Sequence, residues 1–153
     1  MKKIALFPGS FDPFTKGHQD IVLRGSQIFD EIVIGIGKNS QKARFFSLET
    51  MIDLIKDSFQ DHANVQVQAF SGLTATFAKE IGAKYLLRGL RNTTDFEYEN
   101  TIAQVNRNIN NLETVLLITT PELAYISSTI IRDIYRYGEN VDKYLPYKLP
   151  EIK

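Results

Sequence analysis

The sequence of 153 residues contains no cysteine. This absence excludes a disulfide scaffold, a thiolate metal site and a cysteine nucleophile. It also suits a reducing compartment, and we expect the protein to be cytoplasmic. A chain of this length can bury a sizeable core without a covalent staple, so we expect a single domain over residues 1–153.

An excess of charge is absent as well, because 18 Lys and Arg residues balance 18 Asp and Glu residues. Nucleic acid and anionic membranes attract basic surfaces, so we expect neither of them as a partner. The longest apolar runs, 32–36 and 115–118, are too short to cross a bilayer. With two histidines and no H-E-x-x-H motif, we predict no metal-ligating residues.

Short apolar runs alternate with helical patterns along the chain. Five runs predict strands, at residues 4–7, 32–36, 65–69, 85–87 and 115–118. Helical spacing of apolar residues predicts helices at 21–29, 48–59, 73–81, 94–108 and 128–134. We expect Ser47 to cap the second helix and either Ser127 or Ser128 to cap the last one. A capping box of Thr94 and Glu97 is expected to open the fourth.

This alternation predicts an α/β, Rossmann-like fold with a doubly wound five-stranded parallel sheet and helices on both faces. Ligands of such folds bind beyond the carboxyl ends of the strands. The segments expected there carry many cations, namely Lys16, His18, Lys38, Lys42, Arg44, Arg88, Arg91 and Arg132. Gathered at one edge of the sheet, they indicate a polyanionic ligand, most simply phosphates.

The segment PGSFDPFTKGH, residues 8–18, is the most informative of these. Gly9 permits a tight turn, and Gly17 permits close approach of the backbone to a ligand. His18 falls in the first turn of the next helix, where the dipole and the free N–H groups favour an anion. There it can donate a hydrogen bond to a phosphate oxygen. Taken alone, a histidine at this place is more often a solvated or structural residue, and the glycines and the cations elsewhere favour the phosphate role.

Two other motifs resemble nucleotide-binding loops only in part. GIGKNS, residues 35–40, begins like a dinucleotide-binding motif but lacks the third glycine and an immediate helix. FTKGH, residues 14–18, contains a lysine without the spacing of a mononucleotide P-loop. A nicotinamide-dependent oxidoreductase therefore rests on GIGKNS alone.

Three motifs together carry a resemblance to a known family. PGSFDPFTKGH is similar to the T/H-x-G-H signature of the nucleotidyltransferase superfamily, and ISSTIIR, residues 126–132, is similar to its second signature. RGLRNTTDFEYE, residues 88–99, closely resembles the bacterial phosphopantetheine adenylyltransferase family. The resemblance extends from Lys3 to about Pro146. It implies transfer of AMP from ATP to phosphopantetheine by direct in-line attack, giving dephospho-coenzyme A and pyrophosphate for coenzyme A biosynthesis.

The same resemblance implies roles for individual residues. The catalytic residues would be His18, which stabilises the transition state at the α-phosphate, with Lys42, Arg91 and Ser128 on the phosphates. The ATP site would consist of Ser10, Phe11, His18, Gly89, Leu90, Arg91, Glu99, Leu123, Ala124, Tyr125, Ile126, Ser127, Ser128 and Thr129. Phosphopantetheine would be bound by Ser10, Lys42, Thr74 and Arg88, with Arg88 on its phosphate. Position 10 is Ser where the family commonly has Thr, and the hydroxyl is retained.

Further expectations follow from the resemblance. Mg²⁺ would accompany ATP, held mainly by the phosphates, and the protein would be a homohexamer that coenzyme A can bind as a feedback ligand. Two alternatives remain open besides the oxidoreductase. One is the same fold acting on another acceptor, such as nicotinamide mononucleotide. The other is a non-catalytic nucleotide sensor, which would bind ATP without turnover. On charge alone, Arg88 and Arg91 also fit ordinary surface cations.

Overall fold

Strands and helices alternate along residues 1–39 and 41–150, which this computed structural model describes. Ser40, the last residue of the 35–40 motif, and residues 151–153 of the predicted domain lie outside the described residues. The described strands are β1 (Ile4–Gly9), β2 (Glu31–Lys38), β3 (Val65–Ser71), β4 (Tyr85–Leu90) and β5 (Glu113–Ile118). The α-helices are α1 (Lys16–Gly25), α2 (Leu48–Ser58), α3 (Thr74–Glu80), α4 (Thr93–Asn110) and α5 (Ser128–Arg136). Two short 3-10 helices follow β5 and α5, namely η1 (Pro121–Leu123) and η2 (Asp142–Tyr144).

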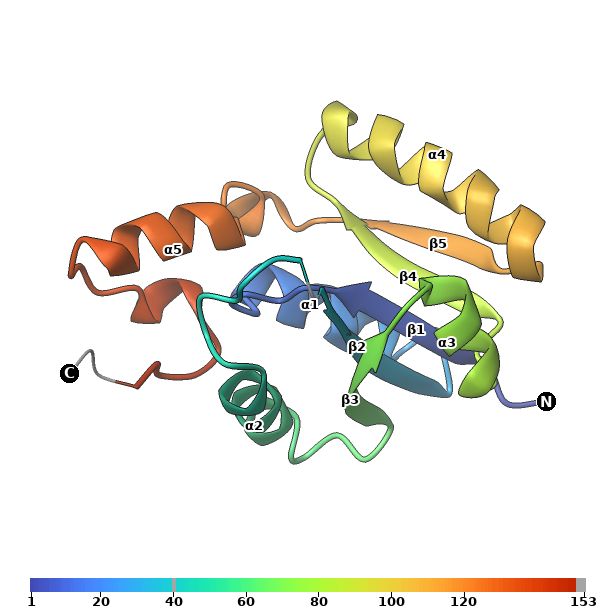
Figure 1. Cartoon of the computed structure of the whole chain (residues 1–153), viewed down its shortest axis with the longest axis horizontal. Coiled ribbons are helices and arrows are strands. Elements are labelled where there is room, and N and C mark those ends of the chain that lie inside the picture. Colours follow the sequence, from blue (N-terminus) through green and yellow to red (C-terminus); the bar gives the residue numbers. More distant parts are fainter. Residues whose placement is uncertain (40, 151–153) are drawn as a thin grey trace.

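The strands form one parallel sheet in the order β3-β2-β1-β4-β5 (Figure 1). The chain starts in the middle strand, winds outward through β2 and β3, and then crosses back to β4 on the other side of β1. At this reversal the segments after β1 and β4 diverge, which opens a crevice at the carboxyl ends of the two strands. The predicted doubly wound Rossmann-like fold is confirmed.

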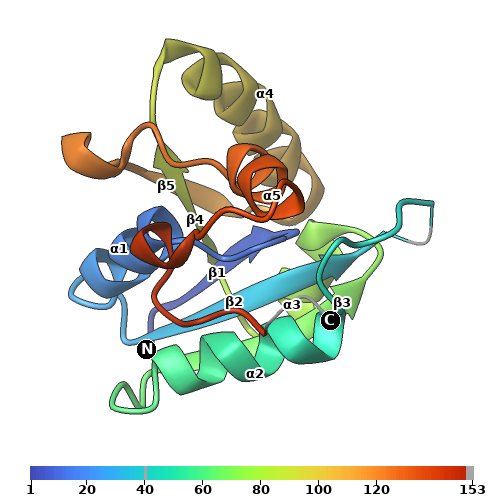
Figure 2. The same ribbon diagram turned by 90° about the vertical axis from the view of Figure 1, so that its left-hand side faces the viewer.

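Helices cover both faces of the sheet, with α1 and α2 on one side and α3 and α4 on the other (Figure 2). Phe7, Ile34 and Ile36 pack toward α1 and α2, whereas Leu6 and Val33 pack toward α3. Because β1 and β2 are buried on both faces, their sequences are almost continuously apolar. None of the helices within the described ranges is long and apolar enough to cross a membrane.

Two helix ends lie where the sequence predicts them, and two do not. Ser47 and Ser127 are the predicted N-caps of α2 and α5. The predicted capping box of α4 is wrong, because Asn92 accepts the Asp95 N–H at 2.9 Å and the helix begins at Thr93.

The first helix ends at Gly25, earlier than its apolar pattern predicts. The N–H groups of Ile28 and Phe29 both turn back to the Gly25 carbonyl. As a result Phe29 is buried, whereas Ile28 lies exposed and does not share a helical face with Ile21.

The packing around β2 leads to a test of stability. A Cβ at Gly35 would lie 2.7 Å from Leu6 Cδ1 and 3.2 Å from the Phe70 and Phe77 rings, which are stacked in the core. We expect Gly35→Ala to lower the free energy of unfolding by about 1–3 kcal/mol, because the close-packed neighbours must shift. Gly37→Ala on the same strand is the control, since its Cβ would meet Phe70 at an ordinary 3.6 Å. Urea unfolding of both variants measures the difference, and equal losses would contradict the overpacking argument.

Candidate active site

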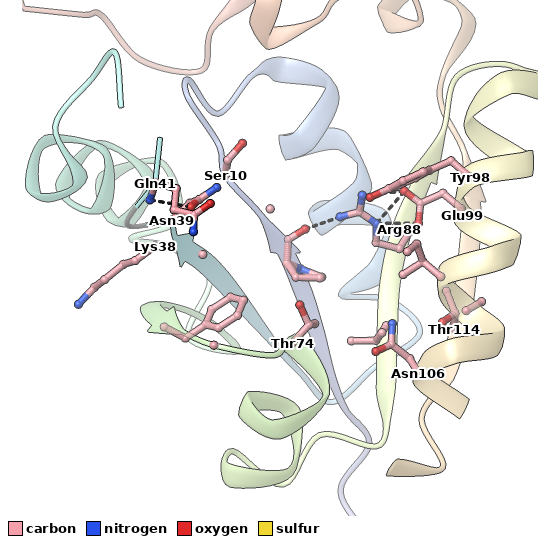
Figure 3. Close-up of a pocket in the computed structure, with 18 residues that line it drawn as sticks. Ser10, Lys38, Asn39, Gln41, Thr74, Arg88, Tyr98, Glu99, Asn106 and Thr114 are labelled. Carbon is pink, nitrogen blue, oxygen red and sulfur yellow. Dashed lines mark hydrogen bonds and ion pairs between the residues drawn. The ribbon is translucent and has the colours of Figure 1, made fainter. Parts of the chain in front are cut away.

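Three adjoining cavities open at the carboxyl ends of the strands. The largest, about 690 Å³, lies between β1, β2 and α4 and is called the α4 cavity (Figure 3). A second, of about 320 Å³, contains His18 and is called the His18 cavity. A third, of about 510 Å³, lies beside the segment after β2 and is called the Lys42 cavity. Their volumes are those of small-molecule sites.

The α4 and His18 cavities share a wall formed by Pro8, Gly9, Ser10, Arg88 and Glu99. The His18 and Lys42 cavities share Ser10, Ser128 and Thr129. Ser10 therefore lines all three cavities. Two ligands that occupied neighbouring cavities would meet at Ser10 and Arg88, on the crevice between β1 and β4.

The His18 ring is held in one orientation at the start of α1. Its Nδ1 accepts the Thr15 N–H at 2.9 Å, and Thr15 Oγ1 accepts the His18 N–H at 3.3 Å, which together form a capping box. The ring is flanked by Phe11 and Phe14, with centroids 5.0 and 5.3 Å away. Since Nδ1 acts as the acceptor, the proton of the neutral ring lies on Nε2.

The charge state of His18 follows from this enclosure. The residue keeps part of its surface on the cavity, but its ring is surrounded by aromatic side chains. Burial, together with the charges of Arg88 and Arg91, lowers the pKa of His18 to about 3. At neutral pH His18 is thus an uncharged hydrogen-bond donor, not a cation.

Arg88, at the carboxyl end of β4, is fixed by two partners. Its Nε lies 3.0 Å from both oxygens of Glu99, its Nη2 lies 2.7 Å from Glu99 Oε1, and its Nη1 donates to the Pro8 carbonyl (Figure 3). The Glu99 side chain is only 7% exposed, compared with 29% for Arg88. The ion pair joins α4 to the central strands and holds the guanidinium on the shared wall of two cavities.

Arg91 is paired in a similar way with Asp95 at the start of α4. Asp95 Oδ2 accepts from the Arg91 backbone N–H at 2.9 Å and from its Nε at 3.1 Å. Burial tends to raise the pKa of Asp95, but these hydrogen bonds and the charges of Arg91 and Arg88 outweigh it and lower the pKa. The carboxylate is therefore ionised and orients the Arg91 guanidinium along the His18 cavity.

The N-terminus of α5 closes the same cavity from the opposite side. Ser127 caps the helix by accepting the Ile130 N–H at 3.2 Å. The Ser128 hydroxyl donates to the Pro13 carbonyl at 2.7 Å, so its single proton is already engaged. The donor that Ser128 can offer to an anion is then its backbone N–H, in the first turn of α5, where helix geometry supplies no partner.

The structure brings most of the predicted site residues together. The predicted ATP-site residues that line the His18 cavity are Ser10, Phe11, His18, Gly89, Arg91, Glu99, Leu123, Ile126, Ser127, Ser128 and Thr129. The predicted phosphopantetheine residues Ser10, Thr74 and Arg88 line the α4 cavity, and Lys42 lines the Lys42 cavity.

Three predicted residues lie outside these cavity walls, namely Leu90, Ala124 and Tyr125. Tyr125 is 66% exposed, and its ring packs edge-on against Tyr144 at 6.2 Å. Glu99 lines the expected cavity, but its carboxylate is occupied by Arg88.

Sequence reasoning missed several wall residues. Thr15, Asp95 and Thr119 line the His18 cavity, and Tyr98, Asn106 and Thr114 line the α4 cavity. The capping position of Thr15, three residues before His18, was a usable signal. Thr114 lines the α4 cavity from the second residue of β5, and nothing in its local pattern distinguishes it.

Comparisons with known proteins identify the family of this chain. The cytidylyltransferase-like family model matches residues 6–134. The phosphopantetheine adenylyltransferase of Cytophaga hutchinsonii is 58% identical over 97% of this chain and all of its own length. That of Lachnoclostridium phytofermentans is 45% identical over 98% of this chain and 93% of its own.

Solved structures of other proteins share the fold. A bifunctional NMN adenylyltransferase/ADP ribose pyrophosphatase from Francisella tularensis, solved with AMP and a manganese ion, superposes with a TM-score of 0.70 at 16% identity. The match covers 98% of this chain and 46% of that protein. At this identity the likeness concerns the fold alone. The family model and the two adenylyltransferase relatives define a nucleotidyltransferase. The chain belongs to the phosphopantetheine adenylyltransferase family within the cytidylyltransferase-like proteins.

The lowered pKa of His18 leads to a prediction about stability. Between the ordinary histidine pKa of 6.5 and the folded-state pKa of about 3, the unfolded chain binds more protons at His18 than the folded chain does. The free energy of unfolding therefore falls as the pH falls through this window. In His18→Gln the amide oxygen can still accept the Thr15 N–H, but nothing titrates.

We expect His18→Gln to lose less stability than the wild type between about pH 7 and about pH 4, as measured by urea unfolding. The comparison concerns the two pH dependences, so a constant offset from altered packing does not affect it. Parallel curves would show that His18 is not buried in its neutral form.

Proposed function

We propose that this protein transfers the adenylyl group of ATP to phosphopantetheine, giving dephospho-coenzyme A and pyrophosphate. Membership of the family supports the reaction. The observation that carries it is the shared wall at Ser10 and Arg88, where two cavities large enough for two substrates meet. We assign ATP to the His18 cavity and the pantetheine arm to the α4 cavity, with the acceptor phosphate between them.

We propose an in-line displacement without a covalent intermediate. An oxygen of the phosphopantetheine phosphate attacks the α-phosphorus of ATP. The bond from that phosphorus to the oxygen bridging to the β-phosphate breaks, and pyrophosphate leaves with the electron pair. The nucleophile is already an anion, so the reaction needs no general base. The protein's task is to align two polyanions and to stabilise the charge of the transition state.

His18 suits the second part of this task. Its Nε2–H can donate to an oxygen of the α-phosphate as negative charge builds there. Because the ring is neutral and fixed by Thr15 and the surrounding phenylalanines, it donates without reorganising. Arg91 and the first turn of α5 complete the donor set around the phosphates, and Lys42 approaches from the third cavity.

We propose that Mg²⁺ enters with ATP as part of the substrate. The described residues contain no group of three His, Asp or Glu side chains that could hold a metal ion. The carboxylates of the His18 cavity, Asp95 and Glu99, are engaged by arginines. Phosphate oxygens and water are the natural ligands for Mg²⁺ in that setting.

Assembly, location and feedback are extensions of the same proposal. We propose a cytoplasmic homohexamer that also binds coenzyme A. Self-association is supported by a stripe of exposed apolar side chains on α4, formed by Tyr98, Ile102, Val105 and Ile109. Coenzyme A carries the same pantetheine arm, for which the α4 cavity has room.

The reaction is tested by pyrophosphate release from ATP and Mg²⁺ with and without phosphopantetheine. We expect release only with the acceptor, and dephospho-coenzyme A as the product. We expect His18→Ala to lower kcat by at least about 10²–10³-fold, the usual loss for one preorganised donor, with ATP affinity changed little. His62→Gln, which alters the other histidine far from the cavities, is the control and keeps the wild-type rate. An unchanged kcat in His18→Ala would refute the assigned role.

A second test concerns the assignment of ATP to the His18 cavity and of the pantetheine arm to the α4 cavity. Thr74 lines the α4 cavity at the start of α3, whereas Thr76 on the same helix is exposed. We expect Thr74→Leu to raise the KM for phosphopantetheine several-fold and to leave the KM for ATP unchanged, because the added bulk narrows only the acceptor side. Thr76→Leu should change neither constant. A larger effect on ATP than on phosphopantetheine would reverse our assignment.

A further inference from the structure

Two segments far apart in sequence are joined by a reciprocal set of contacts beside the shared wall. One comprises residues 10–12, after β1, and the other residues 44–46, between β2 and α2. Arg44 Nη1 donates to the Ser10 carbonyl at 2.5 Å, and Arg44 Nη2 donates to the Phe11 carbonyl at 2.9 Å. In the other direction, Asp12 accepts the N–H groups of Phe45 and Phe46, each at 2.9 Å. We call this set the 10–12/44–46 clamp.

Arg44 is the centre of the clamp because each of its three guanidinium nitrogens donates a hydrogen bond. Its Nε donates to the Phe46 carbonyl at 3.0 Å, which fixes the plane of the fork relative to its own segment. Asp12 Oδ1 lies 3.8 Å from Nη2 and adds an ionic attraction. The side chain is only 19% exposed. A lysine has a single ammonium on a flexible stem and cannot hold three carbonyls in one plane.

The clamp lies between two residues that the proposed reaction uses. Ser10 belongs to the first segment and lines all three cavities. Lys42 precedes Arg44 by two residues and lines the Lys42 cavity. It belongs to the connection between β2 and α2, whose described residues, 39 and 41–47, form no helix or strand. Aromatic contacts anchor the same segment to α5, since Phe45 and Phe46 pack on Tyr135 at 5.9 and 5.2 Å.

We propose that Arg44 is a positioning residue for adenylyl transfer, which sets Lys42 at a fixed place relative to Ser10 before the substrates bind. The inference rests on the proposed function. A displacement of about 1 Å at a reacting group can cost about 100-fold in rate. Arg44 contacts the backbone of the segment that contains Ser10, and Lys42 lies two residues before it in the chain. Arg44 therefore acts on the alignment of these two residues and not on the phosphates directly.

The test compares Arg44→Lys and Arg44→Ala with the wild type in the pyrophosphate-release assay. We expect kcat to fall roughly 10- to 100-fold, with smaller changes in both KM values. Methylguanidinium, added well below denaturing concentrations, should restore part of kcat in Arg44→Ala by filling the vacated place. Arg107→Ala is the control, because Arg107 forms an exposed pair with Glu113 away from the cavities and should neither lose activity nor respond to methylguanidinium.

A double-mutant comparison separates positioning from a general loss of structure. If Arg44 acts by placing Lys42, Arg44→Lys should cost much less in a Lys42→Ala background than in the wild type. Equal fold-losses in the two backgrounds, without methylguanidinium rescue, would overturn the proposal. So would wild-type kcat in both Arg44 variants.

Amide hydrogen exchange at Phe45 and Phe46 provides a readout that needs no acceptor. The Asp12 hydrogen bonds should protect these amides in the wild type, and Arg44→Lys should speed their exchange. Unchanged exchange would overturn the clamp whatever the reaction is. Absence of wild-type turnover with phosphopantetheine, together with faster exchange in Arg44→Lys, would overturn the proposed acceptor and leave the clamp supported.

Discussion

The site depends on how the loop between β1 and α1 satisfies its carbonyl groups. Residues 10–15 contain no regular secondary structure, and most of them are buried, so carbonyl groups left unpaired there would be costly. Side chains from three other parts of the chain supply the donors: the segment between β2 and α2, helix α5 and the C-terminal segment. The pairs are Ser10 and Phe11 with Arg44, Asp12 with Arg132, Pro13 with Ser128, and Phe14 with Tyr147. The loop that presents Ser10 and leads to His18 is thus held from outside.

This arrangement changes the role of the cations. In the sequence alone, the cationic residues of these segments predict a local surplus of positive charge that attracts phosphates. In the structure Arg88 and Arg91 are paired with carboxylates, and Arg44 and Arg132 hold carbonyls. His18 is neutral. Most of the cationic side chains therefore contribute fixed geometry, which suits a reaction whose barrier depends on alignment and on preorganised donors.

Much of this architecture could be read from local patterns. Buried parallel strands, the caps at Ser47 and Ser127, and the clustering of the 8–18, 88–99 and 126–132 motifs at one edge follow from periodicity and from the rule for α/β sheets. The clamp could not be read in this way. Arg44 binds carbonyls 33 and 34 residues away, and a backbone carbonyl has no signature in the sequence. The capping box of α4 failed for a local reason, because Asn92 accepts the Asp95 N–H and the helix begins at Thr93, one residue before Thr94.

Arg88 shows how pairing and ligand binding can coexist in one side chain. A guanidinium has five N–H bonds. Glu99 engages the one on Nε and one on Nη2, and the Pro8 carbonyl engages one on Nη1. One N–H is left on each terminal nitrogen, and these two are the donors available to the proposed acceptor phosphate. Glu99 and Pro8 therefore set the direction of the fork on the wall that separates the two cavities. A buried carboxylate is compatible with this proposed phosphate site, because its charge is balanced by the guanidinium it orients.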